Sequence, residues 1–345
     1  MTRLRRIPAL LLAAMAAIGA LVPAASAADL TEVKVALAWL RNGQYASLMV
    51  ADAKGYYAEE GLKISFIDGG PGKNPVPLVG VGQADFGVTG GTNVFLARLA
   101  PDPVGIVAIG AITQNLPYAY ITLADPNAPD PTPKDLEGKT VGMQADGEIF
   151  LKAIAARNGV DLSKIKTQTV MANAEPLLVG KVDYFTGMVH NQTYQIETEA
   201  AKATDGPLKG KVWKAIRFSE YGVPFYADVI FASTEKLKTS PDLAKRFLRA
   251  VAKGLKYTVE NPDDAVAILA AYPDQIEKAD KLAWRLKVQN PLQVSPDTKT
   301  NGILWMDPNA WEATMAFYHQ YGQIPRTLPA AEVMTNAYNG GVKSK

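Results

Sequence analysis

The chain has 345 residues, of which 48% are hydrophobic and 20% are charged, a composition typical of a globular protein. It contains no cysteine, which excludes thiol nucleophiles, disulfides and iron–sulfur centres. Its two histidines, His190 and His319, lack a metal-ligand spacing, so we expect neither a metal site nor a bound cofactor. The formal net charge is +2; without three N-terminal arginines, 33 basic residues face 34 acidic ones, which gives −1. This balance offers no basic surface for nucleic acid.

Residues 1–27 have the three parts of a secretory signal peptide. Arg3, Arg5 and Arg6 begin it, an apolar run extends from Ile7 to Val22, and Ala25-Ser26-Ala27 forms a small-residue cleavage site. The alternative interpretation is a single membrane anchor. We expect cleavage before Ala28 and a periplasmic mature protein, in which 318 residues remain, a length that suits two domains.

The first half of the chain alternates predicted strands and helices. Runs rich in β-branched and aromatic residues predict strands at 33–39, 63–67, 84–88 and 104–113. Apolar residues at three- and four-residue steps predict helices at 44–59, 77–81 and 90–100. Strands that alternate with helices in this way predict an α/β fold with a mainly parallel sheet.

The alternation restarts after a proline-rich segment, residues 125–133. We predict strands at 140–143, 167–171, 184–188 and 225–233, and helices at 149–158, 177–182, 241–260, 262–271, 275–289 and 309–321, before a disordered tail at 340–345. An internal echo links the two halves, because residues 82–86 (GQADF) match residues 180–184 (GKVDY). The echo favours two lobes of similar construction, with Asp85 and Asp183 as supports of equivalent turns.

Polar and aromatic side chains follow the predicted strands, at the edge where open α/β sheets bind their ligands. One group opens a predicted helix, whose first backbone N–H groups suit a carbonyl or anionic oxygen. Stacking rings together with amide donors and acceptors are what a planar, polar heterocycle requires. The candidate ligand-binding residues of this kind are Trp39, Asn42, Thr89, Gly90, Thr92, Asn93, Gln114, Asn115, Gln144 and Asn191.

Simpler interpretations stay open for several positions. Trp39 also suits a core, and residues 89–93 (TGGTN) also suit a tight turn with a helix cap. For His190 we prefer a surface position, with a place facing the cleft beside Asn191 as the alternative. The glycine-rich segment at 69–74 lacks the first glycine and the Ser or Thr of a phosphate-binding loop, so we reject that function for it.

Five stretches resemble the periplasmic substrate-binding proteins of ABC importers. Residues 53–62 (AKGYYAEEGL), 82–88 (GQADFGV) and 135–142 (DLEGKTVG) resemble the first helix, third strand and second-lobe entry of that family. Residues 37–42 (LAWLRN) and 220–226 (EYGVPFY) resemble its NMT1/THI5-like branch, which binds pyrimidine precursors of thiamin. Sulfonate, taurine and riboflavin-type binders are similar as well.

The resemblance implies a two-lobed type II periplasmic-binding-protein fold, with a mainly parallel, helix-flanked sheet in each lobe. The expected lobes are 28–117 with 227–345, and 118–226, joined by crossings near 116–120 and 222–227. It adds Tyr45, Glu220, Tyr221 and Tyr226 to the candidate ligand-binding residues. The implied partners are a small pyrimidine-like ligand and a membrane permease with its ATPase.

Two departures keep the ligand open. Leu40 and Arg41 replace the Thr-Pro of the pyrimidine binders' turn, and the histidine often found after that turn is absent. A sulfonate, taurine, nitrate or riboflavin-type ligand is therefore the alternative, and Arg41 is the cation that we place at the mouth of the site for an anion. An enzyme is disfavoured, because the eukaryotic relatives that make the thiamin pyrimidine rely on a cysteine-rich segment and no G-x-S-x-G motif occurs here. We expect no catalytic residues.

Overall fold

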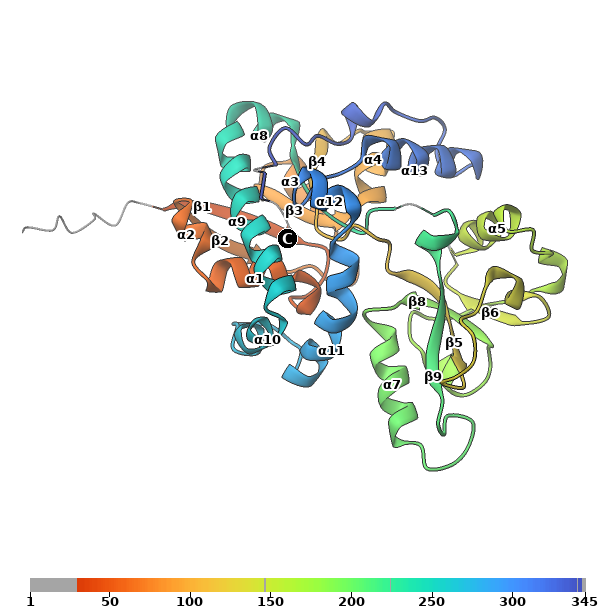
Figure 1. The fold of residues 1–345 in the computed structure, drawn as a ribbon. Coiled ribbons are helices and arrows are strands. Elements are labelled where there is room, and N and C mark those ends of the chain that lie inside the picture. The colour runs from red at the N-terminus through yellow and green to blue at the C-terminus, as the bar shows by residue number, and fades with distance from the viewer. Residues whose placement is uncertain (1–29, 146, 224, 340, 343–345) are drawn as a thin grey trace, which may run out of the picture.

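The computed structural model describes residues 30–145, 147–223, 225–339 and 341–342, which build two five-stranded sheets. Figure 1 shows the sheets as separate halves of the molecule, each flanked by helices. The predicted signal peptide lies outside the described residues, as does most of the predicted C-terminal tail.

The first sheet has the strand order β2-β1-β3-β10-β4. Its strands are β1 (Thr31–Leu37), β2 (Leu62–Ile67), β3 (Phe86–Gly90), β4 (Ile106–Ala111) and β10 (Asp228–Ser233). β1 pairs in parallel with β2 and β3, whereas β10 runs antiparallel to both β3 and β4. All six residues of β4 are buried, as expected for a strand covered on both faces.

The second sheet repeats this plan in the order β7-β6-β8-β5-β9. Its strands are β5 (Tyr118–Ala124), β6 (Thr140–Met143), β7 (Lys166–Thr169), β8 (Tyr184–Met188) and β9 (Val212–Arg217). β6 is parallel to β7 and β8, and β5 is antiparallel to β8 and β9. The predicted α/β class is confirmed. Each sheet has one reversed strand, because β5 and β10 are the strands that the chain enters directly after crossing from the other sheet.

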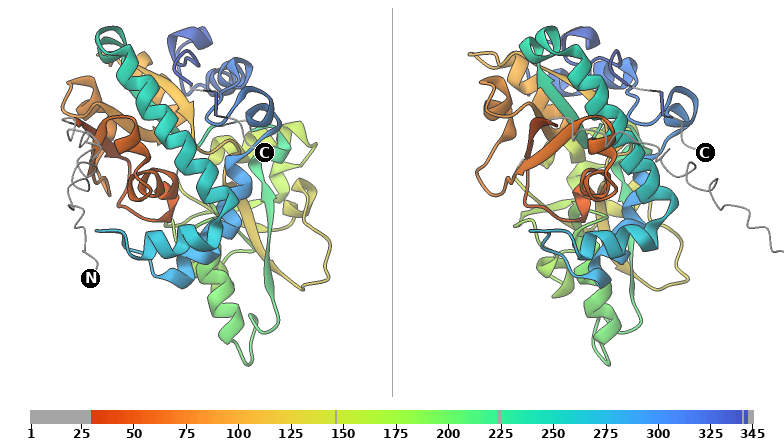
Figure 2. Two further views of the ribbon diagram at one scale, coloured as in Figure 1. Left: turned by 60° about the vertical axis from the view of Figure 1, so that its left-hand side comes forward. Right: turned by 90° about the vertical axis from the view of Figure 1, so that its left-hand side faces the viewer.

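The helices cover the sheets and form the core with them. They are α1 (Ala46–Ala53), α2 (Tyr56–Glu59), α3 (Pro75–Gly80), α4 (Gly91–Leu99), α5 (Glu148–Arg157), α6 (Glu175–Leu178), α7 (Gln192–Lys202), α8 (Thr234–Thr239), α9 (Pro241–Glu260), α10 (Pro262–Ala270), α11 (Ala279–Gln289), α12 (Pro296–Asn301) and α13 (Pro308–Gln320). The long α9 runs beside α1 in both views of Figure 2. Its Phe247 stacks on Phe86 of the first sheet with ring centroids 4.2 Å apart.

Several predicted elements differ from the structure. The helix expected at 44–59 is divided at Gly55, which adopts a φ of 75°, a value that favours glycine. The helix expected at 275–289 begins only at Ala279. β5, β9 and α7 are not among the predicted elements. β5 lies partly in the segment assigned to a crossing, and the burial pattern of β9 shows no alternation that a sequence pattern would reveal.

The internal echo of the sequence corresponds to equivalent turns in the two sheets. The Oδ2 atom of Asp85 accepts a hydrogen bond from the Lys34 backbone N–H at 2.9 Å, and Oδ2 of Asp183 accepts one from Thr140 at 2.8 Å. In each case the backbone N–H of the aspartate donates to the carbonyl of the same partner residue. The two aspartates support equivalent turns, as the sequence predicts.

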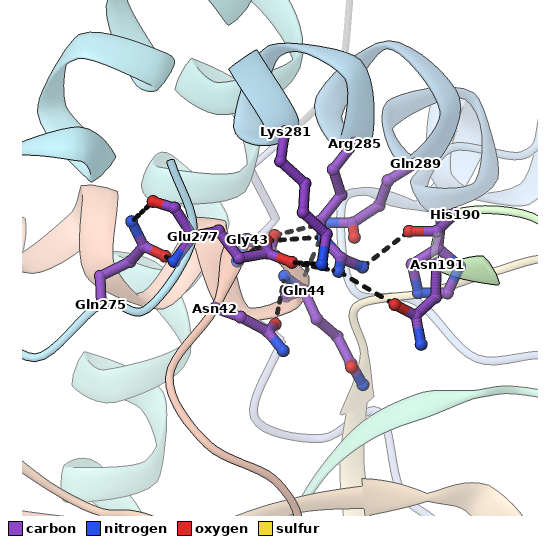
Figure 3. A network of polar contacts seen from close by, with 10 residues as sticks. All are labelled: Asn42, Gly43, Gln44, His190, Asn191, Gln275, Glu277, Lys281, Arg285 and Gln289. Carbon is purple, nitrogen blue, oxygen red and sulfur yellow. Dashed lines mark hydrogen bonds and ion pairs between the residues drawn. The ribbon is translucent and has the colours of Figure 1, made fainter. Parts of the chain in front are cut away.

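A buried ion pair joins the two halves of the molecule (Figure 3). Arg285 of α11 donates to both carboxylate oxygens of Glu277, at 2.5 and 2.8 Å, and the two side chains are only 2% and 4% exposed. The guanidinium also donates to the carbonyl of His190 at 2.7 Å, in the loop after β8 of the second sheet. Glu277 further accepts from the Gly43 backbone N–H at 3.1 Å. Four chain segments therefore meet at one guanidinium–carboxylate pair.

Helices α11 and α7 make a second contact between the halves. The indole N–H of Trp284 donates to Glu197 at 3.0 Å, and the Tyr194 hydroxyl donates to Asp280 at 2.8 Å. Trp213 of β9 donates to the same Glu197 oxygen at 3.3 Å. Since α11 belongs to the C-terminal part of the chain, these bonds anchor that part on the second sheet.

Replacing Glu277 with glutamine should destabilise the protein strongly. The substitution leaves the buried Arg285 guanidinium without a counter-charge, which costs about 3–5 kcal/mol in free energy of unfolding. Lys281→Ala is the matched control, because Lys281 pairs with the same carboxylate at 2.9 Å but is 32% exposed, and should cost under about 1 kcal/mol. Urea unfolding measures both, and equal losses would contradict the assigned importance of Arg285.

The same pair predicts a loss of stability in acid. Burial alone would raise the pKa of Glu277, but hydrogen bonds and charge from Arg285 and Lys281 hold it at about 2, below the ordinary 4.5. A lowered folded-state pKa stabilises the protein fully above the unfolded-state pKa and loses that contribution as the pH falls toward the folded-state value. The free energy of unfolding should therefore fall more steeply below about pH 4.5 in the wild type than in Glu277→Gln. Parallel slopes in urea unfolding would contradict this assignment.

Candidate ligand-binding cleft

A cavity of about 1030 Å³ lies between the two sheets. Its walls come from segments that follow β1, β3, β6 and β8, from the crossing segment 225–228, and from α11 and the loop before it. Parallel strands of both sheets therefore end at this cavity, which is the position where open α/β sheets bind ligands. We call it the cleft.

Ten of the fourteen predicted site residues line the cleft: Trp39, Asn42, Tyr45, Thr89, Gly90, Thr92, Asn93, Gln144, Asn191 and Tyr226. Four others, Gln114, Asn115, Glu220 and Tyr221, are not among its lining residues. The structure thus brings most of the strand-end candidates together. Whether they contact a ligand stays a prediction.

The four remaining candidates are engaged elsewhere. The Gln114 amide donates to the Ala111 and Trp305 carbonyls at 3.0 Å each, and Asn115 donates to the Val294 carbonyl at 3.3 Å. Both amides tie the crossing segment to the C-terminal part of the chain.

Glu220 and Tyr221 lie on a short 3₁₀ helix that ends at a left-handed Gly222. The Glu220 carboxylate is 61% exposed, 3.8 Å from Arg217, and Tyr221 packs against the aromatic cluster of the second sheet. Neither side chain is among those that line the cleft.

Trp39 lies at the mouth of the cleft, with 43% of its surface exposed, which excludes the core interpretation. Tyr45 is 1% exposed, and its hydroxyl accepts the Trp39 backbone N–H at 3.0 Å, so it fixes the turn that carries the indole. Asn42 caps the following helical turn through the backbone N–H of Gln44 at 2.8 Å. Trp39 is therefore held by its backbone while its ring stays accessible.

The start of α4 forms another part of the wall. Asn93 donates to the Thr89 hydroxyl at 2.8 Å, and the Gly91 N–H donates to the Tyr226 carbonyl at 3.1 Å. A Cβ at Gly91 would lie 3.0 Å from that same carbonyl oxygen, which explains the glycine. The start of this helix is thereby locked to the crossing segment.

Asp228 is a cleft residue that strand-end reasoning missed. Its carboxylate is 7% exposed and accepts hydrogen bonds from Gln44 at 2.7 Å and from the Thr113 hydroxyl at 3.0 Å. Burial raises its pKa, and the two hydrogen bonds and the Arg285 charge oppose that effect. The sequence offered one signal for this residue: an acidic side chain at the start of the apolar run DVIFAS, where a buried charge needs partners.

His190 is buried, with 2% of its surface exposed, so the interpretation as a surface histidine is wrong. Arg285 holds its carbonyl, and its side chain lines the cleft. Burial and the nearby Arg285 charge lower the pKa of His190 to about 3, so the imidazole is neutral at physiological pH. Sequence reasoning missed this because the partner that pulls the loop inward is 95 positions away.

Aromatic rings supply most of the remaining apolar wall. Tyr118, Phe150, Tyr194, Phe225 and Tyr318 line the cleft together with Trp39 and Tyr226. The Tyr226 hydroxyl accepts the Asp307 backbone N–H at 2.7 Å, which fixes its ring. These rings offer stacking faces for a flat ligand.

Three cations near the cleft are engaged by acids, and Lys278 is a further cation that lines it. Arg285 and Lys281 both pair with Glu277, and Arg41, placed at the mouth for an anion, pairs with Asp68 at 2.8 Å and Asp274 at 3.1 Å.

Within the described residues, no group of three or more His, Cys, Asp or Glu side chains is suited to hold a metal ion. None of the helices in that part of the chain has the length and apolarity to span a membrane.

Relatives of known name resemble this chain over most of its length. It is 27% identical to a riboflavin-binding protein of Chloroflexus aurantiacus, over 90% of this chain and 87% of that protein. It is 26% identical to a formylaminopyrimidine-binding protein of Halalkalibacterium halodurans, over 89% and 90%. A 4-amino-5-hydroxymethyl-2-methylpyrimidine phosphate synthase of Legionella pneumophila is 25% identical over 71% of this chain and 75% of that enzyme.

Solved structures share the fold. The periplasmic aliphatic sulphonate-binding protein of Escherichia coli superposes with a TM-score of 0.62 at 14% identity, over 89% of this chain and 99% of that one. A desulfurization enzyme gives 0.59 at 13% identity, over 90% and 97%. This architecture is therefore found in both binding proteins and enzymes, and the predicted periplasmic-binding-protein fold is confirmed.

The family assignment comes from a sequence model that covers more than half of the chain. The model described as NMT1/THI5 like matches residues 42–265, from the turn after β1 into α10, and so includes the second sheet, the first sheet except β1, and both crossings. The chain belongs to the NMT1/THI5-like family.

Proposed function

We propose that this protein is the extracytoplasmic solute-binding component of an ABC importer, which captures a small heterocycle such as a thiamin pyrimidine precursor and presents it to a membrane permease. The observation that carries the proposal is the cleft itself, about 1030 Å³ of space between the strand ends of two sheets, lined by aromatic rings and amides. The names of the riboflavin- and formylaminopyrimidine-binding relatives support a heterocyclic ligand.

The chain path supports capture by closure of two lobes. One lobe would comprise residues 28–117 and 227–345, and the other residues 118–226. The sheets are connected by two segments, between β4 and β5 and between β9 and β10. Rotation about these two connecting segments would close the cleft over a ligand and hide the ligand from water. This is the hinge motion by which two-lobed binding proteins work.

The charges of the cleft favour a heterocycle over a sulfonate or nitrate. An anion needs an available cation or converging N–H groups, whereas Arg285, Lys281 and Arg41 are already paired with acids. Lys278 also lines the cleft, and its charge interacts with that of Asp280. The buried Asp228 carboxyl would further disfavour an anion beside it. A riboflavin-type ligand remains the closest alternative, since it is also flat, polar and rich in donors and acceptors.

Catalysis is the rival function, because relatives in the family are named as pyrimidine phosphate synthases. The complete absence of cysteine from the sequence argues against a mechanism that depends on a cysteine-rich segment. A binding protein releases its ligand unchanged. Mass spectrometry of a bound heterocycle recovered after hours of incubation distinguishes the two functions, because a covalent or altered product would favour an enzyme.

The first test is thermal unfolding of the mature protein with a ligand panel. The panel holds an aminopyrimidine precursor, formylaminopyrimidine, riboflavin, taurine, an alkanesulfonate and nitrate. A ligand at a hundred times its dissociation constant should stabilise the fold by about 2.7 kcal/mol, which raises the Tm by roughly 4 °C for a chain of this length. We expect a heterocycle alone to do so. A shift with a sulfonate or nitrate alone would overturn the proposed ligand class.

A second test removes the accessible ring at the mouth of the cleft. Trp39→Ala should weaken heterocycle binding by about tenfold, because it deletes a stacking face together with its buried area. Its neighbour Leu40 is similarly exposed, at 39%, but does not line the cleft, so Leu40→Ala is the matched control and should bind as the wild type does. Titration calorimetry measures both, and unchanged affinity in Trp39→Ala would exclude a stacking function for this residue.

A further inference from the structure

Two buried polar atoms on the second-lobe wall of the cleft have no hydrogen-bond partner among the residues that the structure describes. They are the Thr186 hydroxyl, in β8, and Nδ1 of His190, in the loop that follows. Both residues line the cleft, and they are 3% and 2% exposed. A buried polar group without a partner costs about 1–3 kcal/mol, and most such groups in folded proteins are paired.

The backbone around these two side chains is already fixed. The Gln144 side chain donates to the Thr186 carbonyl at 3.3 Å, and Arg285 donates to the His190 carbonyl at 2.7 Å. The Gln192 side chain accepts the Met188 N–H between them at 2.8 Å. Polar side chains thus fix the backbone of this wall, while the Thr186 hydroxyl and Nδ1 of His190 carry the unmade bonds.

The chemistry of this wall is neutral. Arg285 lies behind His190 with its charge compensated by Glu277, and Lys281 is bound to the same carboxylate. A second cation beside Arg285 in a buried position is unfavourable, so the imidazole stays uncharged. A neutral imidazole has one donor and one acceptor nitrogen, and the threonine hydroxyl can act as either.

We propose that Thr186 and His190 form a ligand subsite that recognises uncharged donor and acceptor groups of a heterocycle, such as a ring amide or an amino group beside a ring nitrogen. The inference rests on the proposed function and assigns a specific part of it to the second lobe. The ligand supplies the missing partners, so the cost of two unmade hydrogen bonds is removed on binding. An ionised carboxylate or sulfonate at this position would find a hydroxyl but no protonated imidazole.

Tyr120 provides the matched control within the same sheet. Its hydroxyl is also buried and without a partner, but the residue lies in β5 and does not line the cleft. An unpartnered hydroxyl alone therefore does not define a subsite. Position on the cleft wall distinguishes Thr186 from Tyr120.

The test compares Thr186→Val, His190→Gln and Tyr120→Phe with the wild type, using riboflavin and formylaminopyrimidine as probes. For the probe that the wild type binds, calorimetry should show affinity about tenfold weaker in Thr186→Val, the loss of roughly one hydrogen bond. His190→Gln should weaken binding as well, and Tyr120→Phe should not. The ligand-free Tm of Thr186→Val should stay unchanged or rise, because the substitution removes an unpaired hydroxyl, and a merely structural threonine would instead lower it.

The outcomes separate this inference from the function on which it rests. Wild-type affinity in both Thr186→Val and His190→Gln would overturn the subsite and leave the proposed function standing. If the wild type binds neither probe nor the aminopyrimidine precursor of the ligand panel, the heterocyclic function is overturned, and the subsite with it. If His190→Gln does not fold, Thr186→Val against Tyr120→Phe decides the question alone.

Discussion

The guanidinium of Arg285 is the constraint on which the arrangement of the cleft depends. A cation that is 2% exposed persists only where acids and carbonyls satisfy its donors, and here Glu277 and the His190 carbonyl do so. These partners come from the loop before α11 and from the loop after β8. Their positions determine the cleft wall, because both loops also line the cavity. The neutrality of His190 follows from its burial, and the same charge adds to that effect.

This arrangement links the wall that would touch a ligand to the contact between the halves. Arg285 is bound through its Nη1 atom to the backbone of the residue whose imidazole lines the cleft. Any displacement of that loop on closure must either carry α11 with it or break a buried, charge-assisted bond, and breaking it is costly. The α7–α11 contact, with Trp284 on Glu197, adds a second link in the same place. Hinge motion would have to carry these contacts along or break them.

The sequence predicted what depends on local pattern and missed what depends on distant partners. Strands such as β3 and helices such as α9 were recognised from periodicity, and the residues that follow strands were expected to meet because parallel strands end at one edge. Asp228 and His190 were missed for a common reason. Each is a polar residue whose environment is set by partners far along the chain, Gln44 for Asp228 and Arg285 for His190. Gln114 was misjudged in the same way, since its amide is occupied by the carbonyl of Trp305, 191 residues away.

The two walls of the cleft differ in the hydrogen-bond donors and acceptors that they offer to a ligand, although the two sheets are built alike. The first-lobe wall presents Asp228, a carboxyl with a raised pKa that is best met by a donor. The second-lobe wall presents the hydroxyl of Thr186 and a neutral imidazole, which accept and donate without charge. A ligand with identical edges would leave one wall unsatisfied. A ring with an amino donor on one edge and a mixed donor–acceptor edge opposite satisfies both, and it can do so in a single orientation. If the proposed function holds, the differences between the repeated lobes, more than their shared plan, would carry the specificity.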